Sequence, residues 1–272
     1  MRSMKYELKE NKKPIWQCRQ VGRLQLILLV LCIPFFSCNS GNAPDCFQNA
    51  GDLKRVVVEV PDFSKVTVFE LLNVVLIQGD EQRVEIESGE FLLDEISAAV
   101  EGDRLILKNE NNCNLFRDYG LSTVYVTAPN ISEIRSSTGL TISNEGILTY
   151  PNLNLVSESF NVPEAETTSG TFDLRVDNES LGIVVNGISY FKLSGVSQNL
   201  SVTVAAGDSR VEAEDLLAQE VTINHRGTND ILVHPQERIS GILRGYGDVI
   251  SFNVPNDVDV EETFEGRLIF RD

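Results

Sequence analysis

The chain of 272 residues carries 40 acidic residues against 23 basic ones, which gives a formal net charge of −17. This excess of negative charge repels phosphate backbones and anionic lipid headgroups, so it argues against nucleic-acid binding and against a polybasic grip on membranes. A hydrophobic content of 42% is ordinary for a globular protein, and the chain can therefore bury a core.

Residues 1–37 have the pattern of an export signal. Seven basic residues precede the apolar run Leu24–Phe36, and the small residue Ser37 follows it. The thirteen residues of this run are few for crossing a bilayer, which takes about 20. With Cys38 next, the segment resembles a bacterial lipoprotein signal peptide. The resemblance implies that Cys38 is lipidated and anchors the protein in the outer membrane; soluble export and an uncleaved signal anchor are the alternatives.

Residues 38–50 form a short polar tether after this signal. Without the leader the chain keeps 16 basic and 38 acidic residues, a net charge of −22. Cys46 and Cys113 remain beside Cys38, an even pair in an oxidising compartment. We expect these two cysteines to form a disulfide, which would close a loop of about 66 residues and stabilise the fold by a few kcal/mol. Two separate buried thiols are the alternative.

Short β-branched segments separated by turn signals predict strands throughout residues 51–128. They are Val56–Val60, Val66–Phe69, Val74–Ile77, Val84–Ile86, Leu105–Leu107 and Val124–Val126. The segment 91–100 differs, because Leu92, Ile96 and Ala99 fall on one face of a helix. We therefore predict one short helix within this N-terminal β region.

Residues 129–272 contain a repeat with a period of twenty residues. Its markers are Gly187, Gly207, Gly227 and Gly247. A turn glycine followed by alternating apolar and polar residues is typical of one rung of a parallel β-solenoid, and residues 267–270 predict a closing strand. An antiparallel β-sandwich is the alternative, since hairpins also space strands regularly. The two regions could also form one continuous domain, 51–272.

Three short stretches connect the chain to a known family. They are Gly120–Pro129, Ser137–Gly139 and Gly247–Ile250. Together with the leader, these stretches resemble the putative auto-transporter adhesin head family, or GIN domain, over roughly residues 55–255. The resemblance implies a β-solenoid-like protein of the cell envelope, and no catalytic residues come with it.

Motifs for nucleophilic or nucleotide chemistry are absent from the sequence. It has no Gly-x-Ser-x-Gly elbow, no Gly-x-x-x-x-Gly-Lys loop and no dinucleotide fingerprint after a strand. The two histidines, His225 and His234, precede turn residues and are interpreted as turn or surface residues. Two thiols and these histidines also lack the spacing of a zinc site, so no metal centre is expected.

Acidic residues near the repeat glycines are the remaining candidates for chemistry. Asp208, Asp230 and Asp248 would line up on stacked rungs, where carboxylates could bind Ca²⁺ or act on a glycan. They are most simply turn residues whose side chains bond the local backbone. Tyr246, flanked by glycines, is the candidate exposed ring for a ligand contact, with a ring folded over the end of the stack as the alternative.

These patterns predict a lipid-anchored protein of the cell envelope that acts as an adhesin-like or structural interaction module. We expect no catalytic activity and no cofactor, although a Ca²⁺ ion could bind. The expected partners are the membrane, through the lipid, and a protein or glycan at the envelope. A glycan-processing enzyme with carboxylates on one face is the main alternative, and a small-ligand carrier is a third.

Overall fold

The structure is a computed structural model that describes residues 49–69, 71–111, 120–159 and 167–271. The predicted signal, most of the predicted tether, and Cys38, Cys46 and Cys113 lie outside these residues. The all-β prediction is confirmed, because the described chain forms one hydrogen-bonded sheet of seventeen strands with a single 3-10 turn. Among the described residues no helix is long and apolar enough to span a membrane.

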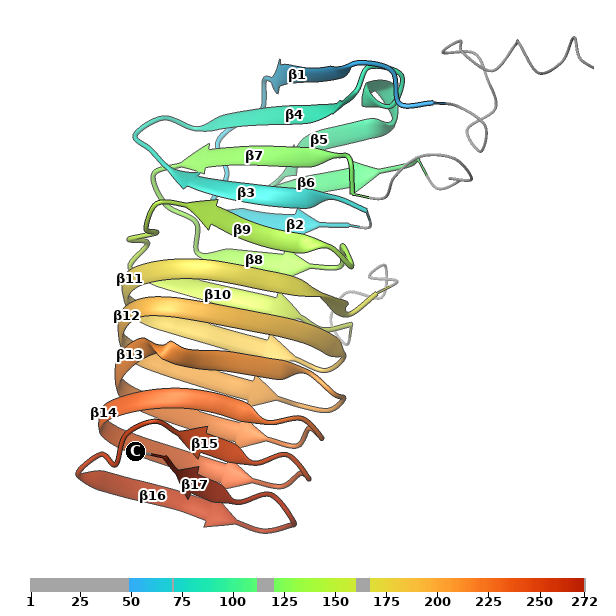
Figure 1. Cartoon of the computed structure of the whole chain (residues 1–272). Coiled ribbons are helices and arrows are strands. Elements are labelled where there is room, and N and C mark those ends of the chain that lie inside the picture. The colour runs from blue at the N-terminus through green and yellow to red at the C-terminus, as the bar shows by residue number, and fades with distance from the viewer. Residues whose placement is uncertain (1–48, 70, 112–119, 160–166, 272) are drawn as a thin grey trace, which may run out of the picture.

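The strands are stacked along one axis (Figure 1). In chain order they are β1 (Leu53–Val58), β2 (Lys65–Val68), β3 (Asn73–Gln78), β4 (Arg83–Gly89), β5 (Ile96–Glu101), β6 (Arg104–Asn109), β7 (Thr123–Ala128), β8 (Glu133–Ser136), β9 (Thr141–Glu145), β10 (Asn152–Ser157), β11 (Ser169–Val185), β12 (Ile188–Val204), β13 (Arg210–His225), β14 (Ile231–Leu243), β15 (Val249–Ser251), β16 (Asp257–Glu262) and β17 (Leu268–Phe270). The 3-10 turn η3 is Leu93–Glu95.

The stack consists of two ladders of paired strands. The first ladder runs β1–β4–β7–β3–β9, and the second runs β5–β6–β2–β8–β10. The long strands β11 to β14 bend and belong to both ladders, after which β15 and β17 end the first ladder and β16 ends the second. From β7 onward the chain therefore alternates between the two ladders.

From β9 onward every pairing is parallel, and the register shifts only at irregularities within the pairs β12–β13 and β13–β14. Phe172 pairs with Phe191, Phe191 with Val211, and Val211 with Ile231, displacements of 19, 20 and 20 residues. This displacement is the physical origin of the twenty-residue repeat. The parallel pairing of these strands differs from the antiparallel hairpins expected of the β-sandwich alternative.

The N-terminal part of the sheet departs from the predicted parallel architecture. Strand β4 pairs antiparallel with both β1 and β7, and β5 pairs antiparallel with β6. The sheet is therefore mixed, and the parallel stacking expected for residues 129–272 does not extend over this whole region. No twenty-residue period is present there in the sequence, because hairpins do not require one.

The predicted helix at residues 91–100 is wrong. Only Leu93–Glu95 form a single 3-10 turn, and Ile96–Glu101 form strand β5. Ile96, Ala98 and Val100 pack on the core with the period of two that a strand requires. The segment forms a strand because it pairs with β6 in a hairpin, and the turn residue of this hairpin, Gly102, adopts the left-handed conformation at φ +66°.

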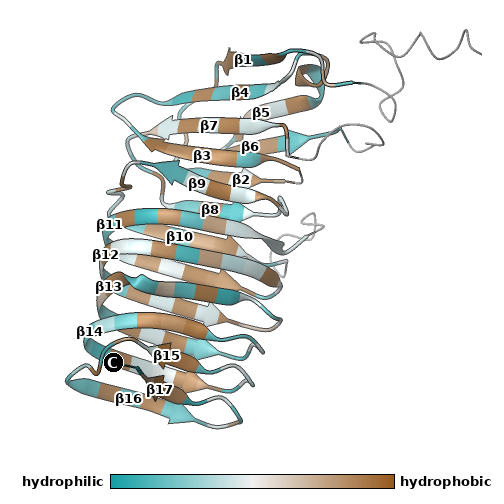
Figure 2. Cartoon of the chain, viewed as in Figure 1, coloured by the Kyte–Doolittle hydropathy of each residue, from teal (hydrophilic) through white to brown (hydrophobic). Residues whose placement is uncertain are grey.

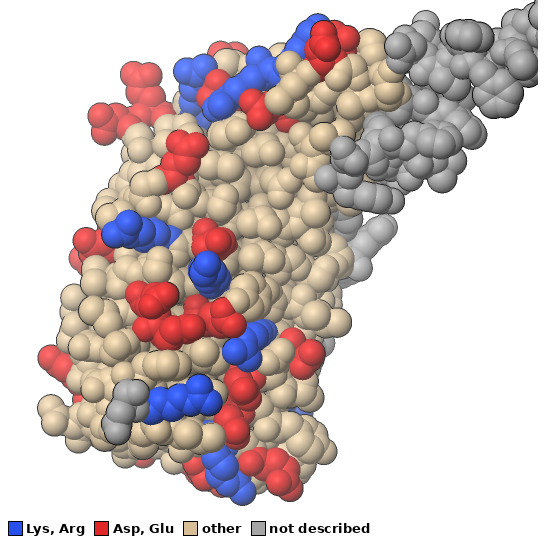
Figure 3. All heavy atoms as spheres, in the orientation of Figure 1, with Lys and Arg blue, Asp and Glu red and all other residues tan. Residues whose placement is uncertain are grey.

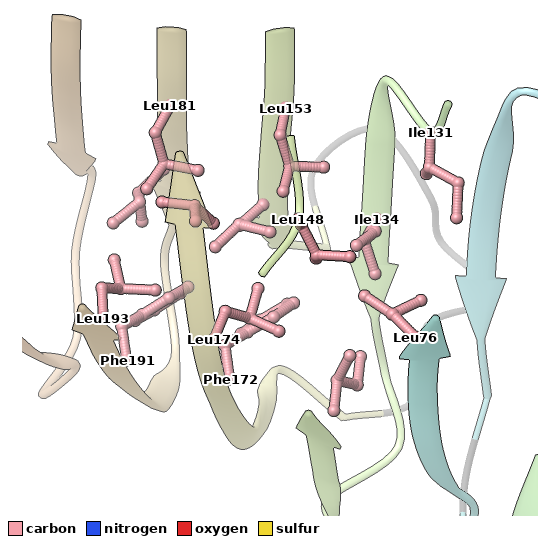
Figure 4. Packing of buried hydrophobic residues seen from close by; sticks show 14 of the residues in the cluster. Leu76, Ile131, Ile134, Leu148, Leu153, Phe172, Leu174, Leu181, Phe191 and Leu193 are labelled. Carbon is pink, nitrogen blue, oxygen red and sulfur yellow. The ribbon is translucent and has the colours of Figure 1, made fainter. Parts of the chain in front are cut away.

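One apolar core extends through the whole stack, from Phe63 to Val249. Apolar and polar residues alternate along the strands (Figure 2), so one side of each strand faces inward. Equivalent inward residues lie on one another in successive turns. The rings of Phe172 and Phe191 stack with centroids 4.9 Å apart and planes inclined by 6° (Figure 4).

The repeat glycines allow the turns of the chain to stack closely. Gly207 adopts φ +86°, and a Cβ there would lie 2.3 Å from the carbonyl oxygen of Gly187. That oxygen accepts a hydrogen bond from the Asp208 amide at 2.9 Å. One turn further, the oxygen of Gly207 accepts from the Thr228 amide at 3.0 Å. The glycine is therefore required by the carbonyl of the preceding turn.

We predict that Gly207→Ala lowers the free energy of unfolding by about 2–5 kcal/mol, because left-handed strain adds to a backbone clash. Gly102→Ala is the matched control: its φ is +66° but nothing lies within 4 Å of the added Cβ. That control should lose only the conformational part, about 1–2 kcal/mol. Urea denaturation of both variants measures the difference, and equal losses would contradict the stacking role.

Candidate functional site

Four turns follow one another along one edge of the stack, and they contain all four predicted ligand residues. These turns are residues 205–209, 226–230, 244–248 and 263–267, each leading from the second ladder back to the first. We call this surface the turn edge; its loops lie on the right side of Figure 1. Asp208, Asp230, Tyr246 and Asp248 lie on the first three turns.

Each of the three aspartates is bonded to the turn that follows it. The Asp208 carboxylate accepts a hydrogen bond from the Thr228 hydroxyl at 2.6 Å. Asp230 accepts from the Asp248 amide at 3.0 Å, and Asp248 accepts from the Arg267 amide at 2.8 Å. The carboxylates thus connect successive turns. Among the described residues no group of three or more His, Cys, Asp or Glu is arranged to hold a metal ion.

Carboxylates elsewhere on the first ladder are also engaged by donors. The carboxylate of Glu212 accepts hydrogen bonds from the Tyr190 hydroxyl and the Arg210 guanidinium, and these two donors lower its pKa. The same hydrogen bond raises the pKa of Tyr190 to about 12. On the face in Figure 3, acidic and basic side chains are interleaved in the same way. A lowered carboxyl pKa is the opposite of what a general acid needs.

Tyr246 is exposed at the turn edge. Its side chain is 64% exposed, and its ring meets Phe264 of the next turn edge-on, with centroids 5.0 Å apart. Phe264 is itself 48% exposed, so the two rings form a small aromatic platform. Sequence reasoning missed Phe264, although a phenylalanine in a Gly- and Glu-rich turn is a signal that could have indicated it.

His225 lies beneath the turn edge and is completely buried, contrary to its interpretation as a turn or surface residue. Its Nδ1 accepts the Gly227 amide hydrogen at 3.3 Å, and its Nε2 has no partner among the described residues. Burial lowers the pKa of His225, although the Asn229 carbonyl and the carboxylates of Asp230 and Asp248 oppose this shift. The alternation of Val221 and Ile223 with polar neighbours already placed residue 225 on the inward side.

Comparison with known proteins gives one family and several similar structures. The model of the family described as "Putative auto-transporter adhesin, head GIN domain" matches residues 62–255. No curated protein matches the chain. A putative adhesin from Bacteroides fragilis has 20% identity and a TM-score of 0.70, and the match covers 82% of this chain and 99% of that one.

Two structures from Parabacteroides are similar as well. A putative adhesin from Parabacteroides merdae has 13% identity and a TM-score of 0.56, covering 81% of this chain and 96% of that one. A putative lipid binding protein from Parabacteroides distasonis has 14% identity and a TM-score of 0.55, covering 82% and 98%. At these identities the likeness concerns the fold.

We predict that Asp248→Ala lowers the free energy of unfolding by about 1 kcal/mol, because the Arg267 amide loses its acceptor. Asp248→Asn retains an oxygen at the same place and should lose less than about half of that amount. Thermal and urea denaturation measure both variants. Equal losses would show that the charge, and not the hydrogen bond between turns, matters.

Stability should also fall on acidification through His225. Because its folded pKa lies below the ordinary value of 6.5, the unfolded chain binds the proton more readily. The contribution of buried, neutral His225 to the free energy of unfolding is complete above about pH 6.5, and it is lost as the pH falls through the pKa of His225 in the folded chain. His225→Gln should flatten the unfolding free energy between about pH 7 and pH 5. A slope that survives His225→Gln would contradict the assignment.

Proposed function

The chain belongs to the putative auto-transporter adhesin, head GIN domain family, and from this membership we propose that it is a lipid-anchored, adhesin-like interaction module of the cell envelope. The observation that carries the proposal is the use of the turn-edge carboxylates. Asp208, Asp230 and Asp248 are each bonded to the next turn, which stiffens the stack. Carboxylates that hold neighbouring turns together in this way have a structural role, which suits an interaction module.

In this proposal the signal of residues 1–37 is removed and a lipid on Cys38 holds the protein in the outer membrane. Residue 49 leads into β1, at one end of the stack (Figure 1). The first ladder has ten strand-to-strand steps between β1 and β17, a length of about 50 Å at ~4.8 Å per step. A lipid at Cys38 would therefore leave β16 and β17 as the end farthest from the anchor.

The body proposed for this role is a β-solenoid from β8 to β17, with the antiparallel strands β1, β4 and β5 as its N-terminal cap. Solenoids need a cap, because the last rung otherwise exposes apolar surface and open strand edges. A rigid stack of this kind offers a long surface to a partner without any moving part. This suits an interaction module better than an enzyme that closes over its substrate.

A disulfide between Cys46 and Cys113 would fix the tether to this cap. Described residues close in the sequence to each cysteine bond to one short segment, residues 91–92. The Ala50 carbonyl accepts from the Phe91 amide at 3.2 Å, and the Asn111 side chain donates to the Leu92 carbonyl at 3.0 Å. Cys46 is four residues before Ala50, and Cys113 is two residues after Asn111. These contacts support the pairing.

Protease shaving of intact cells tests the proposal. Wild type and Cys38→Ala are expressed, the cells are treated with external protease and then fractionated. We expect wild type in the membrane fraction and the variant in the soluble fraction, since the lipid is the only proposed anchor. Cys46→Ser is the control that removes a cysteine and keeps the anchor. A variant Cys38→Ala that stayed in the membrane would overturn the proposal, and cleavage of wild type would indicate surface display.

A further inference from the structure

Two arginines on neighbouring turns of the chain lie side by side on the turn edge. The last paired residues of β13 and β14 are His225 and Leu243, so one further step of the register brings Arg226 next to Arg244. The backbone agrees, because the Arg244 amide donates to the His225 carbonyl at 2.7 Å. Both side chains are exposed. Neighbouring strands lie about 4.8 Å apart, so the two like charges are close.

The two arginines of this pair have no acidic partner, unlike most basic side chains of the described chain. Nine basic residues of the described chain are in ion pairs: Lys54, Arg55, Lys65, Arg83, Arg104, Arg135, Arg210, Arg238 and Arg267. Arg226 and Arg244 have no ion pair among the described residues, and neither do Lys108, Arg175, Lys192 and Arg271. Lys192, however, lies in register between Asp173 and Glu212, whereas Arg226 and Arg244 lie beside each other. Like charges directly opposite each other in a sheet are destabilising. A chain with an excess of acid could easily have placed a carboxylate between them.

The surroundings of the pair supply the other contacts of a sugar site. Tyr246, two residues after Arg244, offers its exposed ring together with Phe264. The two outward positions of the second ladder nearest to the turn edge are uncharged on β12 to β14, and they are Ser201, Thr203, Thr222, Asn224, Ser240 and Ile242. The next outward position carries Asn199, Glu220 and Arg238. Asp259 and Glu261 of β16, in register with Ser240 and Ile242, end this neutral area.

We propose that Arg226, Arg244 and Tyr246 bind a single carboxylated sugar at the end of an otherwise neutral glycan. Two guanidinium groups can hold one carboxylate by paired hydrogen bonds, and the bound anion would offset their mutual repulsion. The ring of Tyr246 packs against the face of the sugar, and the neutral hydroxyl and amide groups accept the following sugar residues. The site rests on the proposed function, since it assigns a ligand to the same turn edge.

The negative net charge of the chain favours a ligand with one acid group over a ligand with many. The body carries a large negative charge, which repels a dense polyanion over its whole length. The Debye length is about 8 Å at physiological salt, so a single carboxylate that reaches the two arginines is screened from most of that charge. Polygalacturonate and single-stranded DNA should therefore bind more weakly than a glycan with one terminal acid.

Isothermal titration of the purified full chain in neutral detergent tests the site. The probe is a xylo-oligosaccharide capped by glucuronate, and the uncapped oligosaccharide is its neutral control. We expect binding of the capped probe only. The double variant Arg226→Gln/Arg244→Gln should weaken it by at least about tenfold. Tyr246→Ala should weaken it as well, whereas Tyr246→Phe retains the ring and should bind nearly as tightly as wild type.

The double variant Arg175→Gln/Lys192→Gln is the matched control, because it removes two exposed charges from the first ladder. Its affinity should equal that of wild type. Equal losses in both double variants, equal binding of the neutral probe, tighter binding of polygalacturonate or DNA, or no binding would each overturn the assignment. The melting temperature of Arg226→Gln/Arg244→Gln should not fall, since a repulsion is removed.

The two proposals fail in different ways. A chain that is anchored through Cys38 and ignores the capped probe overturns the glycan site and leaves the anchored module intact. A chain that binds the probe through Arg226 and Arg244 but stays in the membrane as Cys38→Ala overturns the anchor alone.

Discussion

Parallel, in-register pairing of successive turns is the constraint on which the rest of the structure depends. It places each side chain beside the side chain about twenty residues away, so residues of the same type tend to become neighbours. For apolar residues this is favourable, as in the stacked rings of Phe172 and Phe191. For charges it is unfavourable, and the first ladder avoids the repulsion by alternating sign: Asp173 pairs with Lys192, and Lys192 pairs with Glu212.

The same constraint explains why the ends of the stack differ from its middle. A parallel stack has an open edge at each end, and open edges invite pairing with other chains. At the N-terminal end the chain reverses direction and places the antiparallel strands β1, β4 and β5 over the stack. At the other end, strand β16 carries Asp257, Asp259, Glu261 and Glu262, and a second acidic edge would be repelled by them. The two ends thus limit aggregation by different means.

Sequence reasoning succeeded where the repeat is regular and failed where it is not. The glycines at intervals of twenty predicted turns stacked in parallel, because backbone or side-chain atoms of the preceding turn leave no room for a Cβ, as the Gly187 carbonyl does at Gly207. The N-terminal hairpins have no such period, and the segment 91–100 looked helical because Leu92, Ile96 and Ala99 also fit a helical spacing. Only the pairing of β5 with β6, which is a long-range fact, decides between the two periodicities. His225 was missed for a different reason, since its inward position follows from the alternation of Val221 and Ile223 in β13, which sequence reasoning did not extend to residue 225.

The turn edge shows why a list of polar residues is a weak guide to a site. The three aspartates were the obvious candidates, yet each carboxylate holds the following turn, so their spacing is explained by the fold alone. Arg226 and Arg244 attract no notice in the sequence, because they are eighteen residues apart and match no motif. In the fold they become neighbours of like charge, and no contact within the described chain compensates them. A residue whose arrangement the fold explains needs no ligand, whereas two charges that the fold brings together at a cost in stability point to a partner outside the chain.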